Sequence, residues 1–304
     1  MYDIIVIGGG PAGLTAALYA RRASKSVLVI EKDAFGGQIT HSPKVENIPG
    51  FYSLSGNEFA EKLVEQVMLQ GSDVESCQVL SVMDGGEYKT VKTDDGDFTC
   101  KAVIIATGTK HRMLGIENEE DFVGHGISFC AVCDGAFYKD KTVAVIGGGN
   151  SALQEAILLS KLCSKVYLIQ NLDFFTGEAS LSEQVKNTDN VEIILGAVVN
   201  GLHGDADGEL SKITVENTSA SQISEIDVDG MFVAIGLVPQ NDIFASLIAL
   251  DERGYIKADE GCQTNVRGIF VAGDCRTKKI RQVATAASDG ATAALAACDY
   301  VDGR

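Results

Sequence analysis

Residues 2–14 read YDIIVIGGGPAGL, an apolar run that passes directly into a glycine-rich turn. The turn carries Gly8, Gly10 and Gly13 in a G-x-G-x-x-G pattern, and the Ala- and Leu-rich segment 14–23 follows it. Glycines in this pattern allow a tight turn, a close approach of the backbone to a pyrophosphate, and close helix–strand packing. Glu31 closes the next apolar strand, where a carboxylate can accept hydrogen bonds from ribose hydroxyls. The segment therefore predicts a dinucleotide-binding βαβ unit.

The same pattern recurs in residues 141–153, which read KTVAVIGGGNSAL. Gly147 and Gly149 hold the first two glycine positions, and Ala152 holds the third, where a small side chain still permits close helix packing. This turn predicts a second dinucleotide site, most simply for a nicotinamide; the alternative is a decayed site that keeps only the fold. The expected fold class is α/β, with two Rossmann-like domains of the three-layer ββα type, each holding a small antiparallel β insertion.

The chain order places the second domain inside the first. Alternating segments at about 78–105 and 197–228 predict the two β insertions, and Ser55 and Glu58 have the spacing of a helix capping box. After Gly236 the chain returns to the first domain and closes with an Ala-rich helix at 283–300. We expect residues 1–112 and 241–304 to form the first domain and residues 113–240 the second.

The chain is strongly acidic, with a formal net charge of −17 over 304 residues. Such a surface repels phosphate backbones and anionic lipids, so we expect no nucleic-acid or membrane partner. A signal-peptide pattern and an apolar run of about 18 residues are both lacking. These features predict a cytoplasmic location.

One cysteine pair stands apart from the other cysteines: Cys130 and Cys133 form a C-x-x-C motif. A zinc site would need two further ligands, but the four histidines are dispersed and the other six cysteines are scattered singly, as small buried hydrophobes are. The pair therefore predicts a redox-active disulfide and no metal site. Asp134 is a candidate general acid, or alternatively a turn residue beside Gly135.

Taken in this order, the motifs resemble those of the low-molecular-weight thioredoxin reductases, and the resemblance covers essentially the whole chain. The segments that carry it are Gly8–Gly13, Glu31, Gly36–Gln38, Val45–Gly50, Ala106–Gly108, Cys130–Gly135, Gly147–Ala152, Gly273-Asp274 and Arg281–Ala284. The resemblance implies a discontinuous FAD domain, an inserted nicotinamide domain that carries the cysteine pair, a homodimer, and a rotation about hinges near residues 110–114 and 238–242.

The resemblance also implies a reaction and a set of binding residues. Electrons would pass from a nicotinamide to FAD, to Cys130–Cys133 and on to a thioredoxin-like protein, with Cys130 facing the partner and Cys133 facing the flavin. FAD contacts would fall on Gly8, Gly10, Gly13, Glu31, Gly37, Gln38, Asn47, Thr107, Gly108, Gly273, Asp274, Gln282 and Val283. Nicotinamide contacts would fall on Gly147, Gly149, Asn150, Ser151, Ala152, Gln170 and Asn171.

One segment departs from the pattern of the NADPH-using members. Where those members carry three arginines that bind the 2′-phosphate, this chain has Asn171, Leu172 and Thr176, with Asp173 and Glu178 nearby. Losing charge-assisted hydrogen bonds costs about 1.5–3 kcal/mol each. We therefore expect NADH in preference to NADPH; NADPH with altered contacts, or another donor such as ferredoxin, remain alternatives.

Other functions are compatible with parts of the pattern. A small-molecule dithiol oxidase shares the C-x-x-C motif, but its relatives usually have a degraded nicotinamide turn. A peroxide-defence flavoprotein subunit would need an additional thioredoxin-like module. A non-catalytic flavin-binding redox sensor would not need two neighbouring thiols followed by an acid.

Overall fold

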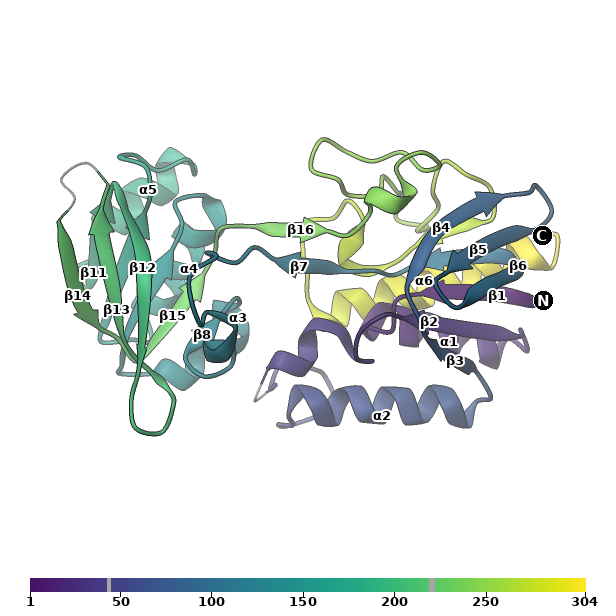
Figure 1. Cartoon of the computed structure of the whole chain (residues 1–304), viewed down its shortest axis with the longest axis horizontal. Helices are drawn as coiled ribbons and strands as arrows, with labels where there is room; N and C mark the ends of the chain where they lie inside the picture. The colour runs from purple at the N-terminus through teal and green to yellow at the C-terminus, as the bar shows by residue number, and fades with distance from the viewer. Residues whose placement is uncertain (43–44, 219–221) are drawn as a thin grey trace. The chain divides into compact units, whose positions relative to one another are not determined.

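The structure is a computed structural model that describes residues 1–42, 45–218 and 222–304. It divides into two compact units, one formed by residues 1–110 and 238–304 and the other by residues 111–237. The sequence predicts domain boundaries after residues 112 and 240, and the structure has them after residues 110 and 237. Figure 1 shows the helices and strands of both units.

The first unit is built on a seven-stranded sheet in the order β3-β2-β1-β6-β5-β4, with β17 paired to β6. Its strands are β1 (Tyr2–Ile7), β2 (Val27–Glu31), β3 (Asp73–Ser76), β4 (Val79–Asp84), β5 (Lys89–Thr93), β6 (Gly96–Ile105) and β17 (Ile269–Val271). Strand β6 pairs in parallel with β1 and β17 through its second half and antiparallel with β5 through its first half. The predicted β insertion is thus an extension of the main sheet.

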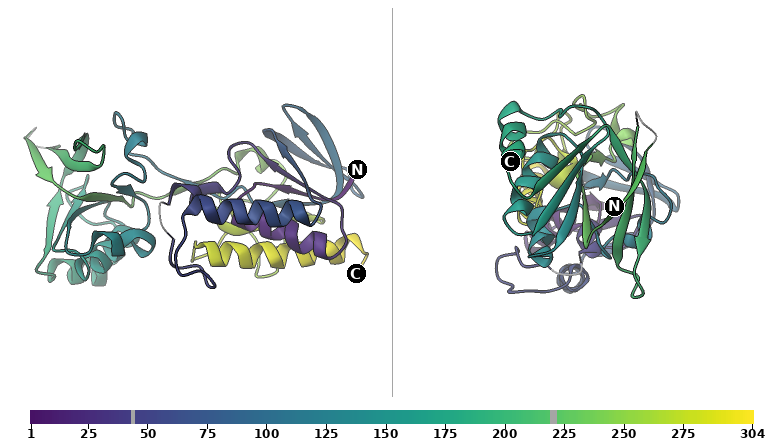
Figure 2. Two further views of the ribbon diagram at one scale, coloured as in Figure 1. Left: turned by 90° about the horizontal axis from the view of Figure 1, so that it is seen from below. Right: turned by 90° about the vertical axis from the view of Figure 1, so that its left-hand side faces the viewer.

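The long helices among the described residues of this unit are α1 (Pro11–Arg22), α2 (Gly56–Leu69) and α6 (Val283–Val301). The sequence predicts that the first helix begins at Leu14, but helix α1 begins at Pro11. Gly10 is its N-cap, and proline suits the first helical position. The predicted capping box of α2 is confirmed, since Ser55 and Glu58 each bond the other's backbone N–H. Helices α1 and α6 lie side by side along one face of the sheet (Figure 2).

The second unit has a five-stranded parallel sheet in the order β11-β10-β9-β15-β8 and a separate antiparallel sheet, β12-β13-β14. The strands of the parallel sheet are β8 (Ile127–Ser128), β9 (Thr142–Ile146), β10 (Lys165–Gln170), β11 (Val191–Leu195) and β15 (Gly230–Val233). The antiparallel insertion is β12 (Ala197–Gly204), β13 (Leu210–Asn217) and β14 (Ile223–Asp227), and the helices are α3 (Ala131–Asp134), α4 (Asn150–Ser160) and α5 (Ala179–Lys186).

The two connections between the units are short strands, β7 (Thr109–His111) and β16 (Leu237–Pro239), which pair with each other. Single 3₁₀ turns complete the description: η1 (Gly37–His41), η2 (Glu120–Phe122), η3 (Gly135–Tyr138), η4 (Asp242–Phe244) and η5 (Gly273–Cys275). The predicted fold class is confirmed. In the described part of the chain, every helix is too short or too polar to cross a membrane.

Candidate active site

The three glycines of the first turn have three different surroundings. Gly8 has φ +112°, and a Cβ there would collide with the Ala106 carbonyl; a Cβ on Gly13 would overlap the Gly8 oxygen. A Cβ on Gly10 would come no nearer than 3.9 Å to any described heavy atom. Gly8 and Gly13 therefore serve the packing of strand and helix, while Gly10 leaves space that a pyrophosphate can enter at the α1 N-terminus.

Glu31 lies at the end of β2, beside this turn. Its carboxylate accepts hydrogen bonds from the Gly9 N–H at 2.7 Å and from the Asp33 N–H at 2.9 Å, one on each oxygen. These bonds fix the carboxylate and leave each oxygen a second acceptor position. The group is therefore held ready for ribose hydroxyl donors.

Asp274 lies in η5, directly after β17. Its Oδ1 is buried without a hydrogen-bond partner among the described residues. Burial raises the pKa of Asp274 to about 6, against the opposing effect of Lys278 and Arg281. A buried acceptor without a donor is costly, so this carboxyl fits a ligand that presents hydroxyl groups, as the ribityl chain of FAD does.

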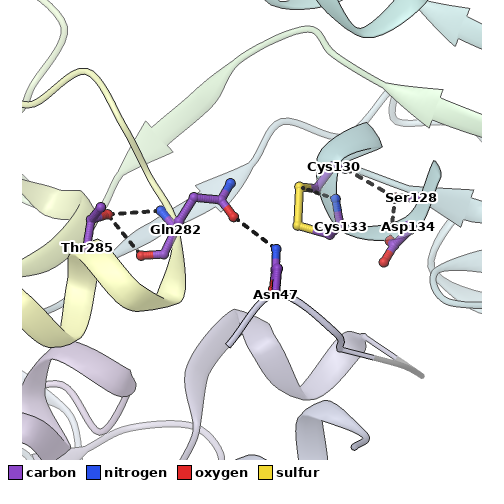
Figure 3. Close-up of a disulfide and its surroundings, with 7 residues drawn as sticks. All are labelled: Asn47, Ser128, Cys130, Cys133, Asp134, Gln282 and Thr285. Atoms are coloured by element: carbon purple, nitrogen blue, oxygen red, sulfur yellow. Dashed lines mark hydrogen bonds between the residues drawn. A yellow bond between two sulfur atoms is a disulfide. The ribbon is translucent and has the colours of Figure 1, made fainter. Parts of the chain in front are cut away.

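The other predicted FAD residues of the first unit lie on loops and helix ends. Thr107 Oγ1 donates to Asn241 Oδ1 at 3.2 Å. Asn47 Nδ2 donates to Gln282 Oε1 at 3.3 Å, as Figure 3 shows. Gln282 is the N-cap of α6, so Val283 is its first residue. Gly37 and Gly108 have φ +66° and +65°, and Gln38 is exposed on η1.

Asn241 is a residue that sequence reasoning missed. It is fully buried, and its Nδ2 donates to the carbonyls of Gly254 and Cys275 at 2.8 and 2.9 Å. Asn241 thereby ties the loop at Thr107 to the backbone beside Asp274. No sequence pattern distinguishes it from an ordinary turn residue.

The second glycine turn repeats the geometry of the first. Gly147 has φ +133°, and its Cβ would lie 2.7 Å from the Ala234 oxygen and 3.1 Å from the Ala152 Cβ. The nearest described atom to a Cβ on Gly149 is Thr176 Oγ1, at 3.8 Å. The second turn thus keeps open backbone at its second glycine, as a dinucleotide requires.

Of the predicted nicotinamide-binding side chains around this turn, some are buried or hydrogen-bonded within the protein and others are exposed. Asn150 Nδ2 donates to Glu178 Oε1 at 2.9 Å, and the Glu178 N–H donates back to Asn150 Oδ1 at 2.7 Å. Gln170 is buried, with its side chain against Gly148 and its Nε2 donating to the Phe174 oxygen at 3.4 Å. Ser151 and Asn171 are exposed. Of the two predicted ribose-binding side chains, Asn171 is therefore the more available.

The cysteine pair forms a disulfide within the second unit. Cys130 and Cys133 have a Cα–Cα distance of 5.3 Å, and Cys130 is the N-cap of α3. The Cys133 N–H donates to Cys130 Sγ at 3.2 Å. A backbone donor aimed at sulfur stabilises a thiolate, so Cys130 is the thiol better suited to nucleophilic attack after reduction.

Asp134 follows the pair and is bonded to Ser128, a second residue that sequence reasoning missed. Ser128 Oγ donates to Asp134 Oδ2 at 2.6 Å and accepts from the Cys130 N–H at 3.1 Å (Figure 3). Asp134 Oδ1 is buried without a partner among the described residues. Burial raises the pKa of Asp134, and the bond from Ser128 opposes part of the rise. The carboxyl is thus placed to hold a proton beside the redox pair.

The six remaining cysteines are free and buried. Burial raises the pKa of Cys100 to about 12 and those of Cys163, Cys262 and Cys275 to about 11. Thiols with a raised pKa are poor nucleophiles, so Cys130 and Cys133 are the cysteines best suited to redox chemistry. Two dinucleotide folds and one such disulfide define a flavin-dependent disulfide oxidoreductase.

Comparison with known proteins supports this class. The family model for pyridine nucleotide-disulphide oxidoreductase matches residues 2–290. The chain is 38% identical to thioredoxin reductase of Bacillus subtilis over 302 residues, covering 99% of this chain and 95% of that one. It is 40% identical to thioredoxin reductase of Listeria innocua, covering 99% and 94%.

A solved structure gives the same result. The thioredoxin reductase of Streptococcus pyogenes superposes with a TM-score of 0.95 at 38% identity, covering 100% of this chain and 99% of that one. The chain therefore belongs to the pyridine nucleotide-disulphide oxidoreductase family, whose members use FAD and a nicotinamide cofactor. Within that family it groups with the low-molecular-weight thioredoxin reductases.

Proposed function

We propose that this enzyme is a thioredoxin-disulfide reductase that passes electrons from a nicotinamide, through FAD, to Cys130–Cys133 and on to a thioredoxin-like protein. The observation that carries the proposal is the disulfide itself, half-exposed at the start of α3 with Asp134 beside it. Val132, between the two cysteines, is 65% exposed and offers an apolar contact to a protein partner.

The residues of the chain suit each part of this relay. Gly10, Glu31 and Asp274 would hold the pyrophosphate, ribose and ribityl groups of FAD, with the remaining predicted FAD contacts lining the same unit. When bound, FAD supplies the two-electron chemistry that reduces the Cys130–Cys133 disulfide. Asp134, held by Ser128, would supply a proton to the departing thiolate.

The exit of electrons is a thiol–disulfide exchange. The Cys130 thiolate attacks one sulfur of the partner disulfide and releases the partner's other sulfur as a thiolate. Cys133 then attacks Cys130 in the mixed disulfide, which restores the Cys130–Cys133 bond and frees the reduced partner. Two electrons leave the enzyme in each cycle. Of the two protons on the product thiols, one comes from the reduced pair and the other is supplied by Asp134, which regains it from solvent.

We also propose NADH in preference to NADPH. Residues 170–178 contain no Lys or Arg that could pair with a 2′-phosphate. The exposed Asp173 and Glu178 add negative charge to the same loop. Asn171 and the backbone of Gly149 and Asn150 would then contact an adenosine ribose and pyrophosphate.

A second candidate donor is a reduced protein such as ferredoxin. The observation that favours it is the Glu178 carboxylate, which is bonded to Asn150 at the α4 N-terminus. A helix N-terminus attracts phosphate through its positive end, and a carboxylate beside it weakens that attraction. This candidate replaces the nicotinamide and leaves the rest of the relay unchanged.

Anaerobic stopped-flow reduction of the bound flavin tests the donor. NADH should bleach the flavin at lower concentration than NADPH, and adding oxidised thioredoxin should restore the colour. Reduction by NADPH at lower concentration than NADH contradicts the NADH preference, and reduction by ferredoxin alone supports the second candidate. If no donor bleaches the flavin, or if thioredoxin fails to reoxidise it, the proposed reductase function is wrong.

The resemblance to thioredoxin reductases adds two further proposals, a homodimer and a cytoplasmic location. The second is supported by the six buried free thiols, since cysteines stay reduced in a reducing compartment. Sedimentation of the FAD-loaded protein, which should give twice the monomer mass, tests the first.

A further inference from the structure

A buried charge cluster centred on Asp289 of helix α6 contacts the η5 turn that carries Asp274. The Asp289 carboxylate accepts hydrogen bonds from the Gly273 N–H at 3.0 Å, from Arg276 Nε and Nη2 at 2.8 and 2.9 Å, and from Lys278 Nζ at 2.9 Å. Arg276 and Asp289 are both buried, and the Lys278 side chain is 8% exposed. One carboxylate therefore fixes two cations and one backbone amide away from water.

The fixed amide belongs to the turn that presents Asp274. Gly273 has φ +81°, and a Cβ there would lie 2.8 Å from the Ala12 Cβ of helix α1. Gly290, the residue after Asp289, packs so closely that its Cβ would overlap the Ala12 oxygen. Asp289 thus joins α6 to the Asp274 turn where both meet the helix of the first glycine turn.

The cluster also sets the charge around Asp274. The charged groups that act on its carboxyl are Lys278 and Arg281, which lower the pKa, and Asp289, which raises it. Arg281 is held separately, with its guanidinium 4.2 Å from the centre of the Tyr255 ring and its Nε donating to the main-chain carbonyl oxygen of Asp274 at 3.3 Å. Asp289 and Lys278 therefore act on Asp274 with opposite signs.

We propose that Asp289 is a positioning residue for FAD: it clamps the Gly273 amide, Arg276 and Lys278 so that the Asp274 carboxylate is held in place for the ribityl hydroxyls. The inference rests on the proposed FAD-binding role of Asp274 and deepens it. Asp289 would not touch the flavin. Asp289 would affect FAD binding in two ways: by fixing the turn that carries Asp274, and by balancing the charges of Arg276 and Lys278.

FAD affinity should report this arrangement through its dependence on pH. Ribityl hydroxyls donate to the ionised carboxylate, so binding favours the charged form of Asp274. Affinity should therefore be highest above the pKa of about 6 and should fall as the pH drops below it. Removing Asp289's charge should move this midpoint to lower pH, and removing Lys278's charge should move it to higher pH.

The experiment measures FAD dissociation constants of the apoprotein by flavin fluorescence from about pH 5 to about pH 8, a range that includes the Asp274 pKa of about 6. Asp289→Asn should weaken FAD binding by about tenfold or more at about pH 7.5. The loss of one charge-assisted hydrogen bond is enough for a change of this size. Its midpoint should shift down, and that of Lys278→Met should shift up. Asp299→Asn, an exposed change on the same helix, is the matched control and should leave both quantities unchanged.

The outcomes separate the two proposals. If Asp274→Asn keeps wild-type affinity and pH dependence, the FAD role of Asp274 is wrong. If Asp274→Asn weakens binding and loses the pH dependence while Asp289→Asn behaves as wild type, the positioning role alone is wrong. It is also wrong if Asp289→Asn lowers affinity only in proportion to the thermal stability of the apoprotein, with no shift of the midpoint. Should Asp289→Asn fail to fold, an unshifted midpoint in Lys278→Met overturns the proposal.

Discussion

Ser128 Oγ donates a hydrogen bond of 2.6 Å to Asp134 Oδ2. Ser128 precedes Cys130 of the redox disulfide by two residues, and Asp134 follows Cys130 by four. The other oxygen of that carboxyl is buried without a partner among the described residues. Burial raises the pKa of Asp134, and the hydrogen bond from the Ser128 hydroxyl opposes part of that rise. This relationship links a residue outside the C-x-x-C motif to its proton chemistry.

Ser128→Ala should raise the pKa of Asp134 further, because the bond that lowers it is gone. A general acid works only while protonated, so the alkaline limb of the pH profile for thioredoxin reduction should move to higher pH. Ser128→Thr keeps the hydroxyl and should retain the wild-type profile. Asp134→Asn should lower turnover by about 100-fold or more. An unshifted limb in Ser128→Ala would exclude the proposed link.

The glycines of the first turn give a matched pair of variants. Gly13→Ala should destabilise the fold by about 1–3 kcal/mol, because its Cβ would overlap the Gly8 oxygen. Gly10→Ala should leave apoprotein stability near wild type and reduce FAD content, since its Cβ would enter only the open space. Thermal unfolding of the apoproteins and the flavin-to-protein absorbance ratio measure the two effects. Equal unfolding temperatures for both variants would contradict the assignment.

Much of this architecture could be predicted from local sequence. The two glycine turns, the capping box at Ser55 and the C-x-x-C motif are each set by residues close in the chain. Asn241 and Asp289 could not be found this way, because they bond Thr107 and Gly273 across long separations in sequence. Ser128 was missed for another reason: a serine near the motif shows its role only when its hydroxyl is seen on Asp134.

The donor preference can be altered by restoring charge to the loop after β10. Asn171→Arg, Leu172→Arg and Thr176→Arg together should shift the enzyme toward NADPH, since each guanidinium bond to phosphate contributes about 1.5–3 kcal/mol. The ratio of kcat/KM for NADPH over NADH should rise by at least tenfold, and Leu172→Gln, which adds no charge, should leave it unchanged. A triple variant with an unchanged ratio would show that the 2′-phosphate does not lie against these residues.

Glu155 on α4 predicts a pH-dependent cost to stability. Its Oε2 is buried without a partner among the described residues, and burial raises its pKa from 4.5 to about 7. An acid whose pKa is raised by folding stabilises the fold below pH 4.5 and loses that contribution as the pH rises through 7. Glu155→Gln should therefore have a free energy of unfolding about 1–3 kcal/mol higher than that of wild type at pH 8, and show a smaller difference at pH 5. Glu183→Gln, exposed on α5, is the control; a difference that shrinks toward pH 8 would contradict the prediction.

Trapping the mixed disulfide tests the central claim that electrons leave through Cys130. Thioredoxin with a single cysteine, activated as its thionitrobenzoate disulfide, is mixed with reduced Cys133→Ser enzyme or with reduced Cys130→Ser enzyme. Attack by Cys130 releases coloured thionitrobenzoate and leaves a covalent enzyme–thioredoxin adduct. The adduct should form rapidly with Cys133→Ser and far more slowly with Cys130→Ser. Faster trapping by Cys130→Ser, or no adduct with either variant, would contradict the proposed route.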